Sequence, residues 1–256
     1  MKLTLRHTLT FSLGTPARAV QHVLLTALAT PQQRIERWSI EMPGFAEAPT
    51  FRDAFGNKAH VVSQVKPDAE IVVKVTGAVE TIDRAGVLGR LDYDPMPAMF
   101  RRPTEATRAD ARLIEGLKDG SDRIAVLHEL MDRVHEQFTA TTQTQAAGEQ
   151  TQSRGSPAKP QDFAQAFVGA TRGLGVPARY VTGYLLDDEG NSSFHAWAEG
   201  WDESLGWISF DAVHNVCPAD TYVRLASGLD AMGAMPIRSV PVWDEMPVEM
   251  VEITAG

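Results

Sequence analysis

The chain has 256 residues, 43% of them hydrophobic, so it can bury a substantial core and is expected to form one or two domains. Its 33 acidic residues outnumber the 24 basic ones, and the net charge of −9 argues against non-specific binding to nucleic acid. The single cysteine, Cys217, excludes intrachain disulfides and a cysteine-rich metal site, and no apolar run is long enough to span a membrane.

The N-terminal pattern is typical of a strand rather than of a secretion signal. Leu3, Leu5, His7 and Leu9 alternate with other residues in the run Lys2–Ser12. No continuous apolar segment precedes a small-residue cleavage site, so we expect a cytoplasmic protein.

Further strand-like runs continue to about residue 95, with turn clusters such as residues 53–57 between them. These runs are Arg34–Glu41, Ala59–Val65 and Glu70–Ile82. Short strands at regular spacing favour a β-sandwich, so residues 1–95 are predicted to form a β-sandwich domain.

Residues 96–256 are expected to form a second domain. The proline-rich stretch 92–105 is interpreted as a linker, and helices are predicted over Arg108–Leu117 and Arg123–Phe138.

A mobile loop is predicted over residues 139–159, which are polar and have no hydrophobic periodicity. It is either a lid or substrate loop over the helix that follows, or a loop that no function constrains. On the preceding helix, His128 and His135 lie seven residues apart and are interpreted as partly buried residues of the helix face, because no third metal ligand is in view.

A helix and three strands are predicted for residues 160–215. Phe163, Phe167 and Ala170 recur at helical spacing, and Pro160 suits the first helical position because its missing N–H would have no partner there. The strands that follow are expected near Ala178–Tyr184, Phe194–Trp201 and Leu205–Ala212.

The last two of these strands are predicted to bring a histidine and an aspartate together. A short turn at residues 202–204 would pair Trp201 with Leu205, and this register sets His195 directly across from Asp211. Directly opposed side chains have Cβ atoms about 4.5–5.5 Å apart, so the imidazole and the carboxylate would hydrogen-bond. A helix start, a histidine and an aspartate in this order indicate a papain-like arrangement of thiol, base and orienting carboxylate.

Four motifs in this stretch resemble those of the bacterial transglutaminase-like proteins of the cysteine-protease type. They are Gln161-Asp162-Phe163-Ala164, then Pro177-Ala178-Arg179-Tyr180-Val181 with Gly183-Tyr184, then His195-Ala196-Trp197, and finally Gly206-Trp207 with Phe210-Asp211. The turn at residues 53–57 is similar to part of the bacterial transglutaminase-like N-terminal region. The resemblance implies acyl transfer or amide hydrolysis through a thioester, without a metal or organic cofactor, and with His195 and Asp211 as a retained catalytic dyad.

One position departs from the family pattern, and it is that of the nucleophile. The family has its catalytic cysteine directly before Gln161, where this chain has Pro160. The exchange removes the thiol and also a backbone N–H that papain-like sites direct at the oxyanion. We therefore expect the fold to be kept and the thiol chemistry to be lost.

The sequence leaves several roles open for the residues around this position. His195 and Asp211 form a structural pair, a ligand-binding site or an acid–base pair. The candidate substrate-binding residues are Trp197, Trp207 and Gln161. The tryptophans share a face with the histidine, where they either line a groove or pack under the sheet.

Other nucleophiles and a metal site are less favoured. Ser153 and Ser156 lie in the predicted loop, which supplies neither a positioned base nor a rigid oxyanion hole. Cys217 is interpreted as structural, because relatives that keep the helix cysteine also have a Cys-Pro pair at this point. Asp211, His214 and Cys217 are spaced by three and, together with His195, would make a mixed metal site, but such spacing at a strand end makes the side chains fan apart, so no metal site is expected.

The sequence thus predicts an α+β fold, with an N-terminal β-sandwich followed by a papain-like transglutaminase core in which a helix packs on an antiparallel sheet. The favoured function is that of a pseudoenzyme, catalytically degenerate, that binds a peptide-like ligand or a partner protein. One alternative is an active amide hydrolase or acyl transferase that uses His195 and Asp211 with a different nucleophile or a water. Another is a structural subunit that works with an active paralogue. No cofactor, nucleic acid or membrane is expected as a partner.

Overall fold

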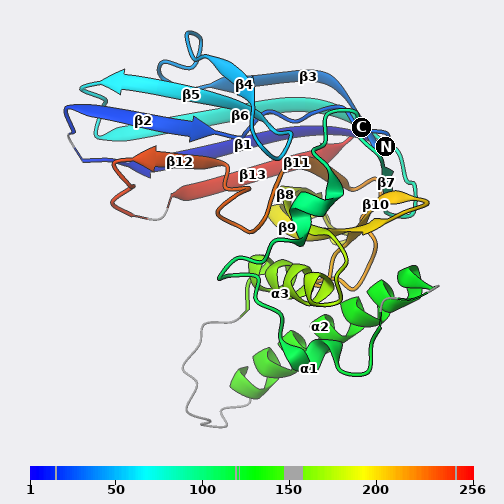
Figure 1. Ribbon diagram of the computed structural model, residues 1–256. Helices are drawn as coiled ribbons and strands as arrows, with labels where there is room; N and C mark the ends of the chain where they lie inside the picture. Colours follow the sequence, from blue (N-terminus) through cyan, green and yellow to red (C-terminus); the bar gives the residue numbers. More distant parts are fainter. Residues whose placement is uncertain (15, 119, 121, 147–157, 246) are drawn as a thin grey trace.

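The computed structural model describes residues 1–14, 16–118, 120, 122–146, 158–245 and 247–256. Figure 1 shows a β-sandwich at one end of the molecule, a third sheet beside it, and the helices on the far side of that sheet. The elements in chain order are β1 (Lys2–Ser12), β2 (Arg18–Val23), β3 (Gln33–Glu41), β4 (Thr50–Arg52), β5 (Lys58–Val65), β6 (Glu70–Thr81), β7 (Val87–Gly89), the 3-10 helix η1 (Pro97–Arg101), α1 (Ala111–Ile114), α2 (Arg123–Ala146), α3 (Pro160–Gly173), β8 (Ala178–Leu186), β9 (Ser192–Asp202), β10 (Gly206–Phe210), β11 (Tyr222–Gly228), β12 (Ile237–Val240) and β13 (Val248–Ala255).

Two four-stranded antiparallel sheets form the sandwich, in the strand orders β13-β1-β6-β3 and β12-β2-β5-β4. The predicted alternation of β1 is confirmed, because Leu3, Leu5, His7 and Leu9 are buried and the residues between them are more exposed. The inward side chains of the two sheets make one hydrophobic core.

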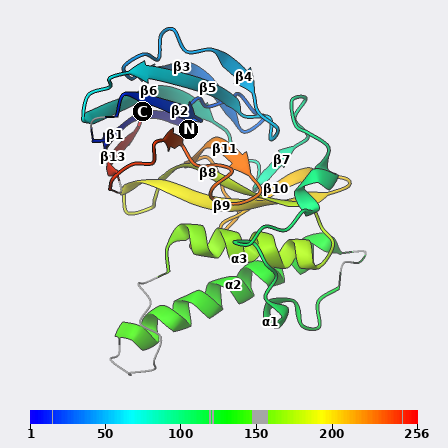
Figure 2. The same cartoon turned by 60° about the vertical axis from the view of Figure 1, so that its left-hand side comes forward.

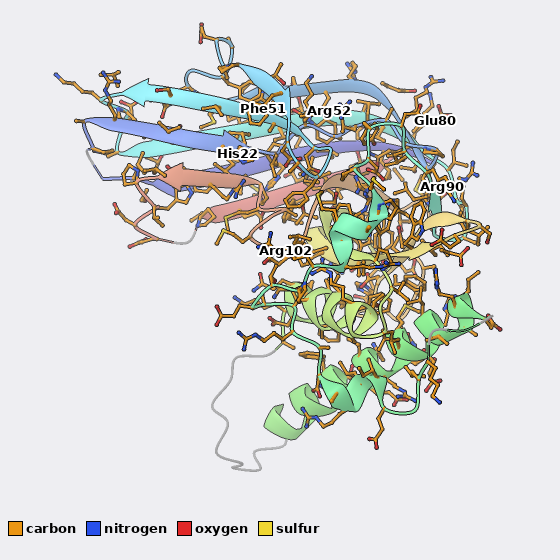
Figure 3. The ribbon with its side chains drawn as sticks, viewed as in Figure 1. His22, Phe51, Arg52, Glu80, Arg90 and Arg102 are labelled. Carbon is orange, nitrogen blue, oxygen red and sulfur yellow. The ribbon has the colours of Figure 1, made fainter. Side chains whose placement is uncertain are left out.

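The sequence did not predict β2 or β4. In β2 the hydrophobic alternation is inverted, because Val20 is exposed while Gln21 is fully buried. β4 has only three residues, too few for a periodic signal. The two strands lie on either side of β5, and the rings of His22 and Phe51 pack across it with centroids 6.1 Å apart (Figure 3).

The last two strands of the chain belong to the sandwich. β13 pairs with β1 and β12 pairs with β2, so each one completes the edge of a sandwich sheet. Conversely, β7 pairs with β10 in the third sheet. The division expected at residue 95 therefore does not coincide with the sheets. Local sequence patterns show that a segment is a strand, but not which distant strand it pairs with.

The third sheet has the order β11-β8-β9-β10-β7 and is covered on one face by α2 and α3 (Figure 2). Phe163 and Phe167 of α3 are buried against it, and Phe167 stacks on Phe210 of β10 with ring centroids 5.1 Å apart. The predicted α+β architecture, with a helix packed on an antiparallel sheet, is confirmed.

Helix α3 begins at Pro160, as predicted. The side chain of Asp162 accepts a hydrogen bond from the backbone N–H of Lys159 at 2.8 Å, which satisfies a donor at the helix start. The helix ends at Gly173, and Gly175 has a φ of +82°, a left-handed conformation that glycine adopts without strain.

The predicted loop over residues 139–159 is helical in its first part, because α2 continues to Ala146. Ala and Gln favour a helix, Thr disfavours it only weakly, and a polar tract without apolar periodicity can extend an established helix. The remaining residues 147–157, with Ser153 and Ser156, lie outside the described part of the chain.

The stretch expected to be a linker, residues 92–105, is packed against the core. Phe100 of η1 is fully buried, and the Asp94 carboxylate forms an ion pair with Arg179 at 2.9 Å. The helix expected over Arg108–Leu117 is reduced to the four residues of α1, and Gly116 just beyond it has a φ of +77°.

No helix in the described ranges is long and apolar enough to cross a membrane. The cytoplasmic location stays a prediction.

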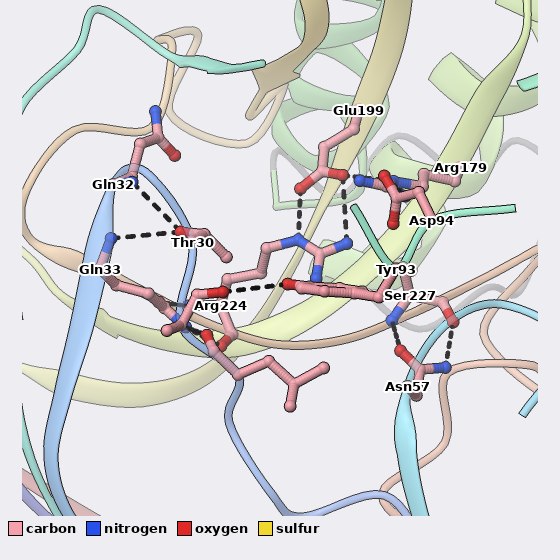
Figure 4. Close-up of polar contacts among 12 residues, drawn as sticks. Thr30, Gln32, Gln33, Asn57, Tyr93, Asp94, Arg179, Glu199, Arg224 and Ser227 are labelled. Atoms are coloured by element: carbon pink, nitrogen blue, oxygen red, sulfur yellow. Dashed lines mark hydrogen bonds and ion pairs between the residues drawn. The ribbon is translucent and has the colours of Figure 1, made fainter. Parts of the chain in front are cut away.

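A buried charge network joins the third sheet to the sandwich (Figure 4). The Glu199 carboxylate on β9 accepts hydrogen bonds from Arg179 and from Arg224 of β11, the latter at 2.7 Å. The Gln33 side chain at the start of β3 bonds both backbone groups of Arg224, each at 2.8 Å. This network fixes β9 and β11, the two strands that carry most of the candidate site.

Candidate functional site

The hairpin of β9 and β10 carries the predicted histidine, but its register differs from the prediction. Trp201 pairs with Trp207 rather than with Leu205. Asp202 accounts for the shift, because its Oδ1 accepts hydrogen bonds from the backbone N–H groups of Ser204 and Leu205 and so keeps Leu205 in the turn. A shift of two residues leaves each side chain on its expected face of the sheet.

His195 and Asp211 meet although they are not opposite each other in the ladder. Asp211 directly follows β10, and a bridge between Asp211 and Val216 closes the turn after it. His195 Nε2 donates to Asp211 Oδ2 at 2.7 Å, and both side chains are almost fully buried. His195 Nδ1 makes no hydrogen bond to any residue that the structure describes. The imidazole is thus oriented through one nitrogen and keeps the other for a further partner.

Two more side chains converge on the same carboxylate oxygen. Asp211 Oδ2 accepts hydrogen bonds from His214 Nδ1 and from the Tyr222 hydroxyl, each at 2.8 Å. The other oxygen, Oδ1, accepts from the backbone N–H of Val213 at 2.9 Å. The part that Tyr222 plays was not predicted, and His214 was considered with His195 and Asp211 only as a metal ligand whose side chain would fan apart from theirs. The only signal for His214 was its place three residues after Asp211, and Tyr222 gave none.

The cluster fixes the charge state of Asp211. Burial raises the pKa of this carboxyl, but hydrogen bonds and charge from His195 and His214 outweigh burial and hold the pKa well below its usual range. The hydrogen bond to Asp211 raises the pKa of His214. Burial and the adjacent carboxylate raise the pKa of Tyr222. Asp211 is therefore an anion that only accepts, and Tyr222 is a neutral donor.

Three of these residues also offer metal ligands. Nε2 of His195, Oδ2 of Asp211 and Nδ1 of His214 all lie within 4.8 Å of one another. Cys217 is not part of this group, and burial raises the pKa of its thiol. A Cβ atom at Gly86 would lie 2.8 Å from Cys217 Cβ, so this cysteine is packed against the backbone before β7.

Trp197 lies beside the dyad, as predicted. Its ring is stacked next to that of His195 at a centroid distance of 6.4 Å and meets the Tyr222 ring edge-on at 5.5 Å. A Cβ atom at Gly183 would lie 2.5 Å from the Trp197 ring, so only glycine lets the indole cover β8. The buried Nε1 donor of Trp197 has no partner among the described residues.

The structure does not bring Trp207 to the dyad. Trp207 is fully buried in a separate aromatic cluster, edge-on to Phe100 at 5.3 Å and to Trp201 at 5.2 Å. The Arg179 guanidinium lies over its ring at 4.1 Å. Trp207 therefore packs the core and shields the buried arginine, and it lines no groove.

The first turns of α3 lie at the same end of the third sheet as His195. The Gln165 side chain of α3 accepts a hydrogen bond from Ala231 N, and Thr182 on β8 donates to Ala234 O. The loop of residues 231–234 thus contacts α3 and also Thr182, which precedes Gly183, the residue of β8 that pairs with His195. Gln161 is exposed on the first turn of α3, and Pro160 is half-buried.

The two histidines of α2 are not part of the candidate site. His135 is half-buried and donates from Nδ1 to the backbone oxygen of Ala212 at 3.0 Å. His128 is exposed rather than partly buried, with its ring edge-on to Phe210.

Two family models match the chain. The model of the transglutaminase-like superfamily matches residues 110–212, which contain Pro160, His195 and Asp211. The model of the bacterial transglutaminase-like N-terminal region matches residues 3–80, which form β1 to β6 of the sandwich.

The curated relatives match shorter segments. A protein-glutamine gamma-glutamyltransferase of Pseudomonas aeruginosa is 35% identical over 77 residues, which are 27% of this chain and 11% of that protein. An uncharacterised protein of Mycobacterium leprae is 32% identical over 89 residues, 31% of this chain and 30% of that protein. An uncharacterised protein of Mycobacterium tuberculosis is 27% identical over 133 residues, 46% of this chain and 42% of that protein. The chain thus spans less than half the length of these relatives.

Among solved structures, a "putative cysteine protease" from Cytophaga hutchinsonii shares the fold. The TM-score is 0.67 over 99% of this chain and 90% of that chain, at 20% sequence identity. The likeness covers the sandwich as well as the third sheet and its helices.

Proposed function

Because the chain belongs to the transglutaminase-like superfamily and has Pro160 at the nucleophile position, we propose that it is a catalytically degenerate member that binds a peptide-like ligand. The observation that carries the proposal is the place of Pro160 at the first residue of α3. A proline there supplies neither a thiol nor a backbone N–H for an oxyanion. Helix α3 therefore provides no sulfur atom at its first residue with which a thioester could form.

The neighbouring groups support a binding role for the same site. Trp197 Nε1 is a buried donor with no hydrogen-bond partner among the described residues, and His195 Nδ1 beside it makes no hydrogen bond to any of them either. An unpaired buried polar atom costs about 1–3 kcal/mol, so such atoms call for an explanation. One acceptor and one donor on adjacent rings match the N–H and C=O groups of an amide. A peptide bond or a glutamine side chain is the ligand that this pair fits.

A specific observation favours a second candidate function, an amide hydrolase or acyl transferase with another nucleophile or a water. His195 and Asp211 keep a hydrogen bond of 2.7 Å that orients the imidazole as a base, although the thiol has gone. In a third role, the protein is a non-catalytic partner of an active paralogue. This role requires only the fold and no chemistry at the site.

Turnover of a panel of peptides, glutaminyl amides and esters separates these functions. The proposal expects no turnover by the wild-type protein, by His195→Ala or by the control His128→Ala, which removes an exposed histidine from α2. Turnover by the wild type that is lost only in His195→Ala would overturn the degenerate assignment and establish the second function.

Ligand binding is tested with fluorescent glutamine-containing peptides and measured by anisotropy. Trp197→Phe keeps an aromatic ring but removes Nε1, and one lost hydrogen bond is expected to weaken binding on the order of tenfold. Trp201→Phe, in the separate aromatic cluster, is the control and should bind as the wild type does. Equal binding by both variants, or no binding by the wild type, would contradict a peptide site at Trp197.

A further inference from the structure

We propose that His195, Asp211 and His214 form a binding site for a divalent transition metal of the zinc class. This inference does not depend on the peptide ligand proposed above. It gives His195 and Asp211 a role in binding a metal ion, separate from any role in thiol chemistry. It starts from the convergence of three ligand atoms on one point of the molecule.

The donor set has the chemistry that zinc prefers. Two imidazole nitrogens and one carboxylate oxygen make a ligand set that suits Zn²⁺, Co²⁺ or Ni²⁺, whereas Mg²⁺ and Ca²⁺ prefer oxygen alone. The atoms come from β9 for His195, the end of β10 for Asp211 and the following turn for His214. Asp211 and His214 thus share one short turn, and the fold brings His195 to them from β9.

The distances require only a small adjustment. His195 Nε2 and His214 Nδ1 lie 2.7 Å and 2.8 Å from Asp211 Oδ2, and all three atoms fall within 4.8 Å of one another. Ligands bonded to zinc at about 2.0–2.1 Å in a tetrahedron are about 3.3 Å apart. Replacing the two bridging protons by one dication therefore needs each imidazole nitrogen to move about half an ångström away from Asp211 Oδ2. It also needs the two imidazole nitrogens, which lie within 4.8 Å of each other, to take the same tetrahedral spacing. The side chain of His214, 41% exposed on its turn, has room for that movement.

The surroundings already hold the carboxylate in place. The Tyr222 hydroxyl donates to Asp211 Oδ2 and the Val213 N–H donates to Oδ1, as outer-shell donors do at zinc sites. In the metal-free protein Oδ2 accepts three donors, more than its two lone pairs accommodate well. A metal would relieve this crowding by taking over the places of two protons.

The electrostatics also favour a cation at this point. Asp187 and Asp188 lie close enough to His214 to act on it through charge, and the whole chain carries a net charge of −9. Three protein ligands would leave one position of a tetrahedral zinc free, as in zinc sites that keep one exchangeable water.

Titration of the metal-free full chain, without a histidine tag, with Co²⁺ and Zn²⁺ tests the proposal. Visible absorption reports the Co²⁺ coordination geometry, and calorimetry counts the bound Zn²⁺. We expect one ion per chain. His214→Gln keeps a hydrogen-bond donor for Asp211 but loses the imidazole ligand, so its affinity should fall by at least about tenfold to 100-fold, the range seen even for outer-shell changes. His128→Gln, the same exchange at an exposed position of α2, should leave the affinity unchanged.

Either of two results would overturn the site: no saturable binding by the wild type, or equal affinity in the wild type and His214→Gln. A fall in affinity of the same size in His128→Gln would likewise place the ion elsewhere. Circular dichroism of both variants confirms that they are folded, and His195→Gln provides an independent ligand removal. The peptide-binding assay with Trp197→Phe remains a separate readout, so a failure of the metal site and a failure of the ligand site are distinguishable.

Discussion

Asp211 holds the candidate site together through one oxygen atom. His195, His214 and Tyr222 all donate to Oδ2, and the carboxylate itself is fully buried. A carboxylate in this position organises three side chains that come from different segments. Its removal leaves several donors without an acceptor at once.

Replacing Asp211 with alanine is expected to lower the free energy of unfolding by about 2–5 kcal/mol, because it leaves buried donors unpaired. Urea unfolding of the variant and the wild type measures this loss. Asp188→Ala, at an exposed position, should change the free energy by less than about 0.5 kcal/mol. A loss below that limit for Asp211→Ala would show that the cluster does not stabilise the fold.

For single residues, the sequence predicted the dyad and the place of Trp197 beside it, but not the part that His214 and Tyr222 play. His195 and Asp211 followed from motif spacing, and they meet even though the predicted register was two residues out. His214 and Tyr222 join the cluster through the turn closed by the Asp211–Val216 bridge. The path of such a turn depends on tertiary contacts, so residue spacing alone did not reveal it.

Among the elements, β8 shows how a small residue positions a functional one. Gly183 pairs with His195 across the sheet, and the space above it is taken by the Trp197 ring and by the backbone oxygen of Val223. The glycine thus sets the place of the indole beside the dyad.

A methyl group at Gly183 is expected to destabilise the protein and to displace Trp197. In Gly183→Ala the added Cβ would overlap Val223 O and would lie 2.5 Å from the Trp197 ring. Such overpacking costs about 1–3 kcal/mol, which thermal or urea unfolding measures. The control Gly120→Ala meets nothing closer than Lys118 O at 3.8 Å and should be near neutral. Equal stability of the two variants would contradict overpacking of a side chain at Gly183.

Elements with strong periodicity were predicted well, and those without it were not. The spans of β1 and α3 followed from alternation and from helical spacing with a proline start. β2 was missed because it buries Gln21 and exposes Val20. The continuation of α2 to Ala146 was missed because a polar tract gives no apolar stripe, although it can prolong a helix that is already anchored.

Across the whole molecule, the buried charge network ties the two halves together. Glu199 is fully buried between Arg179 and Arg224, and Arg224 is bonded through its backbone to Gln33 of the sandwich. Burial raises the pKa of Glu199, but the two guanidinium groups outweigh burial and hold the pKa below its usual value. The carboxylate therefore stays charged in the folded protein.

This lowered pKa predicts the direction of a pH effect. A carboxyl whose folded pKa lies below its unfolded value contributes stability that is present above the unfolded pKa, about 4.3 for glutamate, and is lost as the pH falls through the folded pKa. We expect the free energy of unfolding to fall from neutral pH toward acid, and to fall less steeply in Glu199→Gln. The exposed Glu189→Gln serves as the control. Parallel pH curves for Glu199→Gln and the wild type would exclude Glu199 as a source of the effect.

The sequence predicted the architecture but not how the chain connects its parts. The sandwich and the transglutaminase-like core were both expected, yet β12 and β13 return to the sandwich and β7 enters the third sheet. The residue pattern of a strand shows which of its faces is buried, but it does not show which other strand pairs with it. The closing strands of the sandwich come from the far end of the chain, so no single boundary divides the two units.

His195 is held as an oriented base by Asp211, and α3 begins with Pro160, which we propose stands at the place of the nucleophile. Pro160→Cys restores a thiol at that place, and labelling by a thiol-directed acylating probe measures its reactivity. We expect the introduced thiol to react faster than Cys217, whose pKa is raised by burial. We also expect its rate to fall by at least roughly tenfold when His195→Ala is added, because an activating base is then missing. Labelling that is no faster with His195 than without it would contradict an intact base at this position.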